Sequence, residues 1–362
     1  MASDHPDNPT QALRGRGAVS NLAGRFAQST SALESDGWDL EAPPPRRLET
    51  EALPERAKSI IATNRSPDLP FEQSINPYRG CEHGCIYCYA RPAHAYVDLS
   101  PGLDFETRLF FKPDAPALLE RALRKPGYRC KPIALGSNTD PYQPLERDKR
   151  LTRKLLQVMQ RFQQPVTIVT KGQLILDDLP LLAEMARDNL CQVAISVTTL
   201  DNALKRRLEP RTAGPAARLR TIEALRYADI PVAVMAAPMI PAINDSELEA
   251  ILSAAHAAGA EQAAYILLRL PHEVAPLFRQ WLQEHYPERM SHVMSLIRQS
   301  RGGRDYDSSF SQRQTGSGVF AQLLAQRFRI SCRKLGLNQR RQTLDCSHFA
   351  APPRAGEQQS LF

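Results

Sequence analysis

The chain has 362 residues, of which 42% are hydrophobic and 23% charged, and its net charge is +7. This composition allows a sizeable buried core, and no apolar run approaches the length of a membrane span. The seven cysteines are an odd number. Because the N-terminus also lacks the basic-then-apolar pattern of a secretory signal, we expect a cytoplasmic protein without a disulfide framework.

The predicted elements begin after a long polar stretch. Residues 1–55 are rich in Pro, Ser, Arg and Asp and are predicted to be a flexible tail, in which apolar patches at 22–26 and 38–40 could still dock on the main domain. Short apolar runs then alternate with segments of helical spacing. The predicted strands are 74–80, 132–136, 165–170, 192–199, 231–236 and 263–270. The predicted helices are 152–162, 181–187, 218–227 and one that begins with Asn244 as its N-cap.

Strands that alternate with helices favour parallel βα units, and continuous apolar strands fit a sheet that is buried on both faces. An open doubly wound sheet is the alternative, although its usual G-x-G-x-x-G and GxxxxGK[ST] loops are absent. We therefore favour an α/β fold with a partial barrel of six βα units over residues 56–272. In such barrels the chemistry lies at the carboxyl ends of the strands.

The C-terminal region is predicted to be a helical extension at 273–345, followed by a flexible tail at 346–362. Its last helix places Leu323, Leu324 and Phe328 on one face and ends near Gly336.

Basic residues are concentrated between Arg298 and Arg341, where ten Lys and Arg accompany only Asp305 and Asp307. A patch of this kind suits nucleic acid, and a solvated basic face is the alternative interpretation.

The strongest motif is CEHGCIYC, which places Cys81, Cys85 and Cys88 in a CxxxCxxC spacing. Three thiolates on a short loop can hold three irons of a 4Fe–4S cluster and leave the fourth iron open. A zinc site that uses these cysteines with His83 or His94 is the alternative. Zinc sites usually combine two CxxC halves, and no second half follows.

This motif resembles the signature of the radical S-adenosylmethionine (radical SAM) superfamily, with Tyr87 at its aromatic position. The wider text SINPYRGCEHGCIYCYARP, GSNTDPYQPLE, VTK and EPR resembles the spore-photoproduct-lyase-like, or DNA-repair-photolyase-like, branch over residues 55–345. The resemblance implies a partial (β/α)6 radical SAM barrel, a 4Fe–4S cluster and S-adenosylmethionine. It also implies reductive release of a 5′-deoxyadenosyl radical that abstracts hydrogen from a substrate.

Residue roles follow from the resemblance by position. The cluster ligands would be Cys81, Cys85 and Cys88. The cofactor-binding residues would be Tyr87 and Met239 beside the adenine, Asn138, Thr139 and Asp140 at the methionine amine, Lys171 at its carboxylate, Ser196 and Thr198 at the ribose or carboxylate, and Glu209 and Arg211 at the polar end. Each also has an ordinary structural interpretation, since Asp140 before Pro141 suits a turn and the segment 198–201 suits a helix cap.

The match to spore photoproduct lyase is incomplete. Tyr87 and Tyr89 match the tyrosines that flank the last cluster cysteine in that enzyme, and they are the predicted catalytic residues. The hydrogen-donor cysteine before the second-strand motif is absent from residues 135–138, and neither Cys130 nor Cys191 can be assigned that role. Residues proposed to face the substrate are His272 and Glu273, with a surface loop as the alternative, and the turn 301–306, which could touch a phosphate or simply end a helix.

The expected partners are an external electron donor of the flavodoxin or ferredoxin type and, from the basic segment, DNA or RNA; no membrane contact is expected. A radical enzyme acting on a protein, peptide or metabolite, and a non-catalytic iron–sulfur or zinc module, are the alternatives. The motifs do not separate the substrates, because they bind the cofactor.

Overall fold

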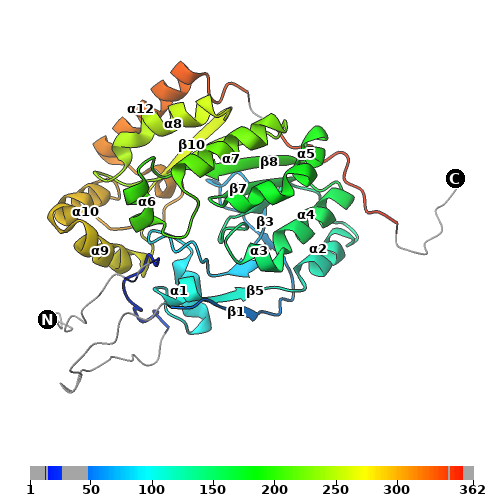
Figure 1. Ribbon diagram of the computed structural model, residues 1–362, viewed down its shortest axis with the longest axis horizontal. Helices are drawn as coiled ribbons and strands as arrows, with labels where there is room; N and C mark the ends of the chain where they lie inside the picture. Colours follow the sequence, from blue (N-terminus) through cyan, green and yellow to red (C-terminus); the bar gives the residue numbers. More distant parts are fainter. Residues whose placement is uncertain (1–12, 14, 27–47, 341–342, 354–362) are drawn as a thin grey trace.

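The computed structural model describes residues 13, 15–26, 48–340 and 343–353 (Figure 1). The predicted apolar patch at 38–40 lies outside these residues.

A seven-stranded sheet forms the centre of the fold, in the order β10-β9-β8-β7-β6-β3-β2. Its strands are β2 (Ile61–Thr63), β3 (Gln73–Ile75), β6 (Ile133–Leu135), β7 (Val166–Thr170), β8 (Cys191–Ser196), β9 (Val232–Met239) and β10 (Gln262–Leu267). All neighbours from β3 to β10 are parallel, and β2 pairs antiparallel with β3. The six parallel strands coincide with the six predicted strands. Because β10 and β2 are the sheet's two edges, the partial barrel is open between them.

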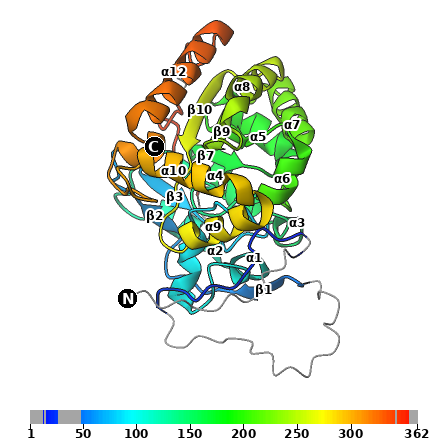
Figure 2. The same cartoon turned by 90° about the vertical axis from the view of Figure 1, so that its left-hand side faces the viewer.

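Amphipathic helices cover the outer side of this sheet (Figures 1 and 2). They are α2 (Ala115–Leu123), α4 (Leu151–Arg161), α5 (Leu179–Arg187), α7 (Pro215–Tyr227) and α8 (Leu248–Ala257). Helix α6 (Asn202–Leu208) instead packs Leu204 and Leu208 into a second hydrophobic cluster with Ile86 and Trp281. In α4, Leu155, Leu156 and Met159 are fully buried, as their helical spacing predicts. Shorter helical turns are η1 (Arg91–Val97), α1 (Asp104–Thr107), α3 (Glu146–Lys149), η2 (Gln173–Asp178) and η3 (Asp245–Glu247).

The N-terminal region is more ordered than the predicted tail. A second, three-stranded sheet contains β1 (Glu51–Pro54), β5 (Arg108–Phe111) and β4 (Tyr78–Arg79), so the fold begins before residue 55. Residues 15–26, which we call the N-terminal segment, also pack on the domain. Phe26 contacts the ring of Tyr96, and Leu22 packs against the core. The patch predicted at 22–26 therefore does dock.

The C-terminal extension contains α9 (Val274–His285), η4 (Pro287–Arg289), α10 (Met290–Gln299), α11 (Gln312–Thr315) and α12 (Gly318–Leu335). Gly336 ends α12 with a left-handed backbone (φ 69°), as predicted. Leu324 is buried and Phe328 packs on the core, but Leu323 is 52% exposed, so its assignment to the apolar face was wrong. Phe349 stacks near Tyr128, which places part of the predicted C-terminal tail on the barrel.

None of the helices in the described part of the chain combines the length and the apolar character that a membrane span requires.

Candidate functional site

The cysteine loop lies directly after β4, at the end of the barrel where the carboxyl ends of the parallel strands meet. Tight turns bring its cysteines together, since Gly84 N donates to Cys81 O (3.3 Å) and Cys88 N donates to Cys85 O (3.2 Å). All three thiols are free. Burial raises the pKa of Cys81, and nearby Asp140, Cys85 and Cys88 raise it further. The three thiols are therefore close enough to influence one another electrostatically.

A buried guanidinium holds the backbone of this loop. Arg91 donates to Cys85 O (2.9 Å) and Gly84 O (3.3 Å), and it pairs with Glu106 at 2.5 Å. Glu106 in turn accepts the backbone N–H groups of Gly17 and Ala18 at 2.9 and 2.8 Å. Gly84 has φ +67°, and a Cβ there would lie 2.7 Å from Glu106 Oε2. Arg91 and Glu106 thus connect the cysteine loop to the N-terminal segment.

The loop after β6 supports the cysteine loop from another side. Gln143 accepts from Glu82 N (2.9 Å) and donates to Gly80 O (3.3 Å). The Thr139 hydroxyl donates to Tyr78 O (3.2 Å), and Asn138 N donates to the side chain of Asn76 (3.1 Å). The predicted motif therefore lies beside the cysteines, and sequence reasoning missed Gln143 as a loop-positioning residue.

Asp140 is enclosed by donors from three directions. Its carboxylate accepts from Tyr142 N (2.9 Å), the Thr170 hydroxyl (2.6 Å) and Lys171 N (2.7 Å), and His83 Nδ1 lies 3.3 Å away. Burial alone would raise its pKa, but His83, Thr170 and Lys171 N–H lower it to about 2. The contact to Tyr142 N is the turn interaction that an Asp before Pro suggests. Asp140 therefore fixes the ends of β6 and β7 together.

Glu209 is the centre of a buried network of predicted cofactor residues. Its carboxylate accepts from the hydroxyls of Tyr87 and Thr198, the latter at 2.6 Å, and lies 3.8 Å from Lys171 Nζ. Lys171 Nζ also lies over the Tyr87 ring, 5.9 Å from its centroid. Tyr87 belongs to the cysteine loop, so strands β7 and β8 and the EPR segment meet this loop in one place.

Arg218 at the start of α7 neutralises Glu209, and sequence reasoning missed it. Its guanidinium pairs with the Glu209 carboxylate and donates to Ser196 O (2.9 Å) and Ala213 O (2.9 Å). Burial would raise the pKa of Glu209, but Arg218, Lys171 and the two hydroxyls lower it to about 2. Glu209 therefore remains a carboxylate inside the fold. A single arginine in an otherwise ordinary helix carries no sequence signal for this role.

The remaining predicted residues lie around the same end of the barrel. Ser196 and Met239 are buried at the ends of β8 and β9. Arg211 lies apart from the Glu209 network, because it pairs with Glu82 at 2.5 Å. Tyr89 is 43% exposed, donates to Ser137 O, and carries the guanidinium of Arg269 4.4 Å from its ring centroid.

Several proposed substrate contacts have other roles. Glu273 is buried against Arg25 of the N-terminal segment (3.0 Å), whereas His272 is exposed on a surface loop. Arg301 is buried and donates to Leu267 O and Leu268 O, so the turn 301–306 ends α10, and Arg301 is not placed at a surface phosphate site. Asn244 stands at the N-cap position of η3, as predicted, but its side chain makes no cap hydrogen bond: its Nδ2 donates to Thr198 O (2.7 Å) and its Oδ1 accepts from Ile240 N (2.6 Å).

The cysteines outside the motif lie away from this site. Cys191 begins β8 and Cys130 precedes β6, so both lie near the amino ends of the strands, opposite the cysteine loop. Neither is placed to donate hydrogen at the rim.

The two histidines of the zinc alternative are engaged elsewhere. His83 faces Asp140, and His94 Nε2 lies 2.9 Å from Arg108 O in a buried position. Within the described ranges, no group of three or more His, Cys, Asp or Glu is placed to hold a single metal ion. Three free thiols on one loop fit the softer chemistry of an iron–sulfur cluster.

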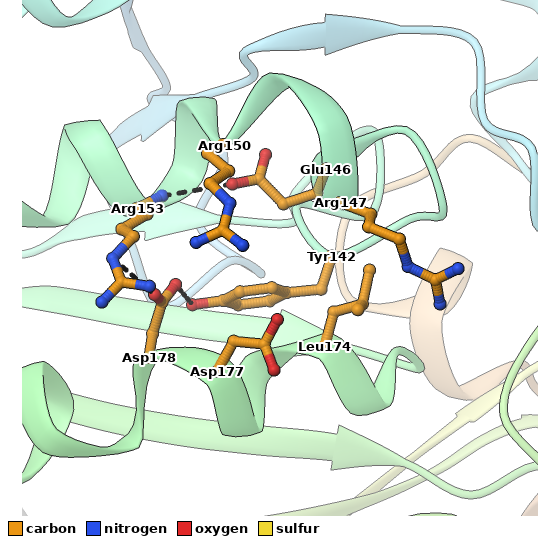
Figure 3. Close-up of a pocket in the computed structure, with 8 residues that line it drawn as sticks. All are labelled: Tyr142, Glu146, Arg147, Arg150, Arg153, Leu174, Asp177 and Asp178. Atoms are coloured by element: carbon orange, nitrogen blue, oxygen red, sulfur yellow. Dashed lines mark hydrogen bonds and ion pairs between the residues drawn. The ribbon is translucent and has the colours of Figure 1, made fainter.

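A small hollow of about 20 Å³ lies beside the loop after β6 (Figure 3). Tyr142 directs its hydroxyl to Asp178 (2.9 Å), and Arg153 approaches the same carboxylate at 3.5 Å. This volume accommodates about one water molecule. The hollow is therefore part of the polar support of the loop and is too small for a cofactor.

Comparison with known proteins shows which family the chain resembles. The family model described as the radical SAM superfamily matches residues 75–255. The uncharacterized protein Rv2578c of Mycobacterium tuberculosis is 40% identical over 242 residues, which are 66% of this chain and 71% of that protein. The uncharacterized protein MJ0683 of Methanocaldococcus jannaschii is 26% identical over 197 residues, 54% of this chain and 71% of the relative.

Among solved structures, a spore photoproduct lyase complexed with dinucleoside spore photoproduct superposes with a TM-score of 0.56. The identity is 12%, and the match covers 79% of this chain and 80% of the lyase. At this identity the likeness establishes the shared fold.

Proposed function

Because the chain belongs to the radical SAM superfamily, we propose that it binds a 4Fe–4S cluster through Cys81, Cys85 and Cys88 and cleaves S-adenosylmethionine reductively. The observation that supports this most directly is the set of three free thiols on one loop, packed against the buried Glu209 network. A bound cluster supplies one electron that splits S-adenosylmethionine into methionine and a 5′-deoxyadenosyl radical.

The protein's own residues bind and orient the cofactor. Lys171 is 15% exposed and only 3.8 Å from its buried partner, so its ammonium can also serve the methionine carboxylate. Glu209 holds Lys171 and Tyr87 in place, and Arg218 keeps Glu209 charged. The Asp140 carboxylate already accepts from the Thr170 hydroxyl and Lys171 N and faces His83. We therefore assign Asp140 mainly a positioning role for the rim and assign the methionine amine to Asn138 and Thr139.

Of the two predicted catalytic tyrosines, Tyr89 is the one open to a substrate. Tyr87 is 8% exposed and engaged with Glu209, whereas Tyr89 is 43% exposed. Residues 135–138 contain no cysteine. We therefore assign Tyr89 to hydrogen transfer with the substrate and Tyr87 to the cofactor.

Nucleic acid is our preferred substrate class, and a protein, peptide or metabolite is the alternative. The preference draws on the fold shared with a lyase that binds a dinucleoside photoproduct and on exposed Arg329, Arg333 and Arg340. The basic segment is smaller than its sequence suggests, because Arg327 pairs with Glu249 (2.6 Å).

Mobility shifts at low salt test this preference. Replacing Arg329, Arg333 and Arg340 with Ala should weaken binding to duplex DNA, single-stranded DNA and tRNA alike and flatten the salt dependence, because fewer counterions are released. If the parent protein binds none of the three nucleic acids, a protein, peptide or metabolite becomes the preferred substrate class.

Anaerobic purification and reconstitution test the central proposal. The protein should be brown, carry about four irons per chain, and release 5′-deoxyadenosine from S-adenosylmethionine when dithionite is added. Cys85→Ala should lose the iron, whereas Cys191→Ala, at the opposite end of the barrel, should keep it. A preparation that holds one zinc and no iron would refute the proposal.

A further inference from the structure

A basic hollow lies on the outer side of the cysteine loop, between the N-terminal segment, α6 and the end of α9. Its volume is about 320 Å³. The residues that line it are Leu13, Gly15, Arg16, Ala203, Arg206, Arg207 and His285. Four of these side chains are basic and none is acidic, so the hollow presents positive charge to whatever enters it.

The two exposed arginines of α6 in this hollow have no ion-pair partner in the described part of the protein, whereas Arg16 is buried and donates to Glu106 O and Leu48 O. No described carboxylate lies within 4.0 Å of the basic groups of Arg206, Arg207 or His285, although Arg211 and Arg25 nearby both have carboxylate partners. Burial and the adjacent Arg207 lower the pKa of His285, and Glu284 raises it, so the positive charge of this wall comes mainly from Arg206 and Arg207. Such a concentration of like charge becomes favourable when an anionic group binds.

Both walls of the hollow touch the cysteine loop. Leu208, the residue after Arg207, accepts a hydrogen bond at its carbonyl from Ile86 N (3.1 Å). Gly17, the residue after Arg16, is packed so tightly that a Cβ on it would lie 1.8 Å from Gly84 O. Arg207 and Arg16, which line the hollow, are therefore each followed in sequence by a residue that contacts the backbone beside Cys85.

The proposed reaction consumes one electron for each S-adenosylmethionine that is cleaved. Elsewhere in the described chain, Cys130, Cys191, Cys332 and Cys346 are free thiols, and no second cluster of cysteines is present. The electron must therefore be supplied by another molecule, and the hollow is a surface whose walls contact the cysteine loop directly.

We propose that this hollow is the docking point for an acidic, one-electron carrier protein, whose surface carboxylates enter between Arg206, Arg207 and His285. The inference rests on the proposed function. In the docked complex the carrier loses one electron and the site held by the three cysteines gains it, and no bond or proton is exchanged. Complementary charge of this kind mainly accelerates association and makes it dependent on salt.

The charge reversal Arg206→Glu with Arg207→Glu tests the proposal. Both side chains are exposed on α6, so the fold should tolerate the change. The matched control is Arg121→Glu with Lys125→Glu, which changes the charge equally at exposed positions in and just after α2; α2 and α6 lie on different sides of the barrel in Figure 1. Calorimetry with oxidised flavodoxin or ferredoxin at low salt should show affinity weakened about tenfold or more for the α6 variant only.

Stopped-flow reduction separates this inference from the proposed function. With reduced flavodoxin, the α6 variant should be reduced about tenfold or more slowly than the parent, with a flatter salt dependence. With dithionite, which needs no protein docking site, both should form 5′-deoxyadenosine equally. Failure of the parent with dithionite would remove the proposed function, independently of the hollow.

Three results would overturn the docking proposal. The first is equal carrier affinity and reduction rate in the parent and the α6 variant. The second is a parent that binds neither carrier at low salt. The third is a loss of DNA or RNA binding in the α6 variant with carrier binding unchanged, which would assign the hollow to phosphate groups instead.

Discussion

Replacement of Arg218 by Met removes the main neutralising partner of Glu209 while it keeps much of the side-chain volume. Glu209 is fully buried, and without Arg218 its nearest cation is Lys171, 3.8 Å away. The hydroxyls of Tyr87 and Thr198 remain as donors, but they carry no charge. The variant therefore leaves a buried carboxylate that is only partly compensated.

The expected loss of stability follows from the electrostatics of this pair. All partners of Glu209 together lower its pKa from 4.5 to about 2, with Arg218 the largest of them, and this corresponds to about 3 kcal/mol of folding free energy at neutral pH. Breaking one partner of a buried ion pair costs about 3–5 kcal/mol in general. Because the folded pKa is depressed, this contribution is present above pH 4.5 and is lost as the pH falls to about 2.

Urea unfolding of the cluster-free protein, followed by circular dichroism at pH 7, measures this loss. Arg220→Met is the matched control, because Arg220 is an exposed residue of the same helix. Adding Glu209→Gln to Arg218→Met should recover about 2 kcal/mol, since the uncompensated charge is then gone. If Arg218→Met costs no more than Arg220→Met, Glu209 does not depend on Arg218 and our account of the network is wrong.

Three further changes address the rim and the N-terminal segment. Lys171→Ala should leave the iron content intact and weaken S-adenosylmethionine binding by about 1.5–3 kcal/mol in calorimetry, whereas Lys154→Ala, at an exposed position, should change neither the iron content nor the binding. Asp140→Asn should lower stability at neutral pH, and its difference from the parent should shrink as the pH falls from 3.8 to about 2, since the folded pKa is depressed; a constant difference would contradict the assigned contacts. Gly17→Ala should lower the melting temperature and speed loss of iron in air, because its Cβ would clash with Gly84 O, while Gly214→Ala, whose Cβ would find only Asn202 Oδ1 at 3.6 Å, should not.

Local pattern was sufficient to predict the barrel and the place of its site. Each parallel strand is a short, continuous apolar run in the sequence. Such a run predicts a strand here because both faces of the sheet are covered by the rest of the fold. The cysteine spacing and the polar residues after the strands then place Lys171, Thr198 and Asp140 at one end. These predictions needed only strand order and direction.

Contacts between distant segments could not be predicted in the same way. Asn244 has the sequence context of an N-cap, but its side-chain amide donates to the buried carbonyl of Thr198. That carbonyl needs a hydrogen-bond donor only because β8 packs beside β9, and the local sequence does not show this. The sequence gives no reason to pair Arg327 with Glu249, because the two residues meet only when α12 packs beside α8. Arg91 lies within the matched text CYARP and Glu106 lies outside the quoted motifs, but neither role could be predicted, because each side chain satisfies carbonyl or N–H groups of other segments.

The contacts of the N-terminal segment have a consequence for the order of events during synthesis. This segment is synthesised before its partners Glu106, Glu273 and Gln280, which are made about 90 to 260 residues later. Contacts of such separation form late, because loop closure must precede them. The contacts of this segment with Glu273 and Gln280 can therefore form only after α9 has been made, so the N-terminal segment and α9 complete the cover on this side of the cysteine loop last.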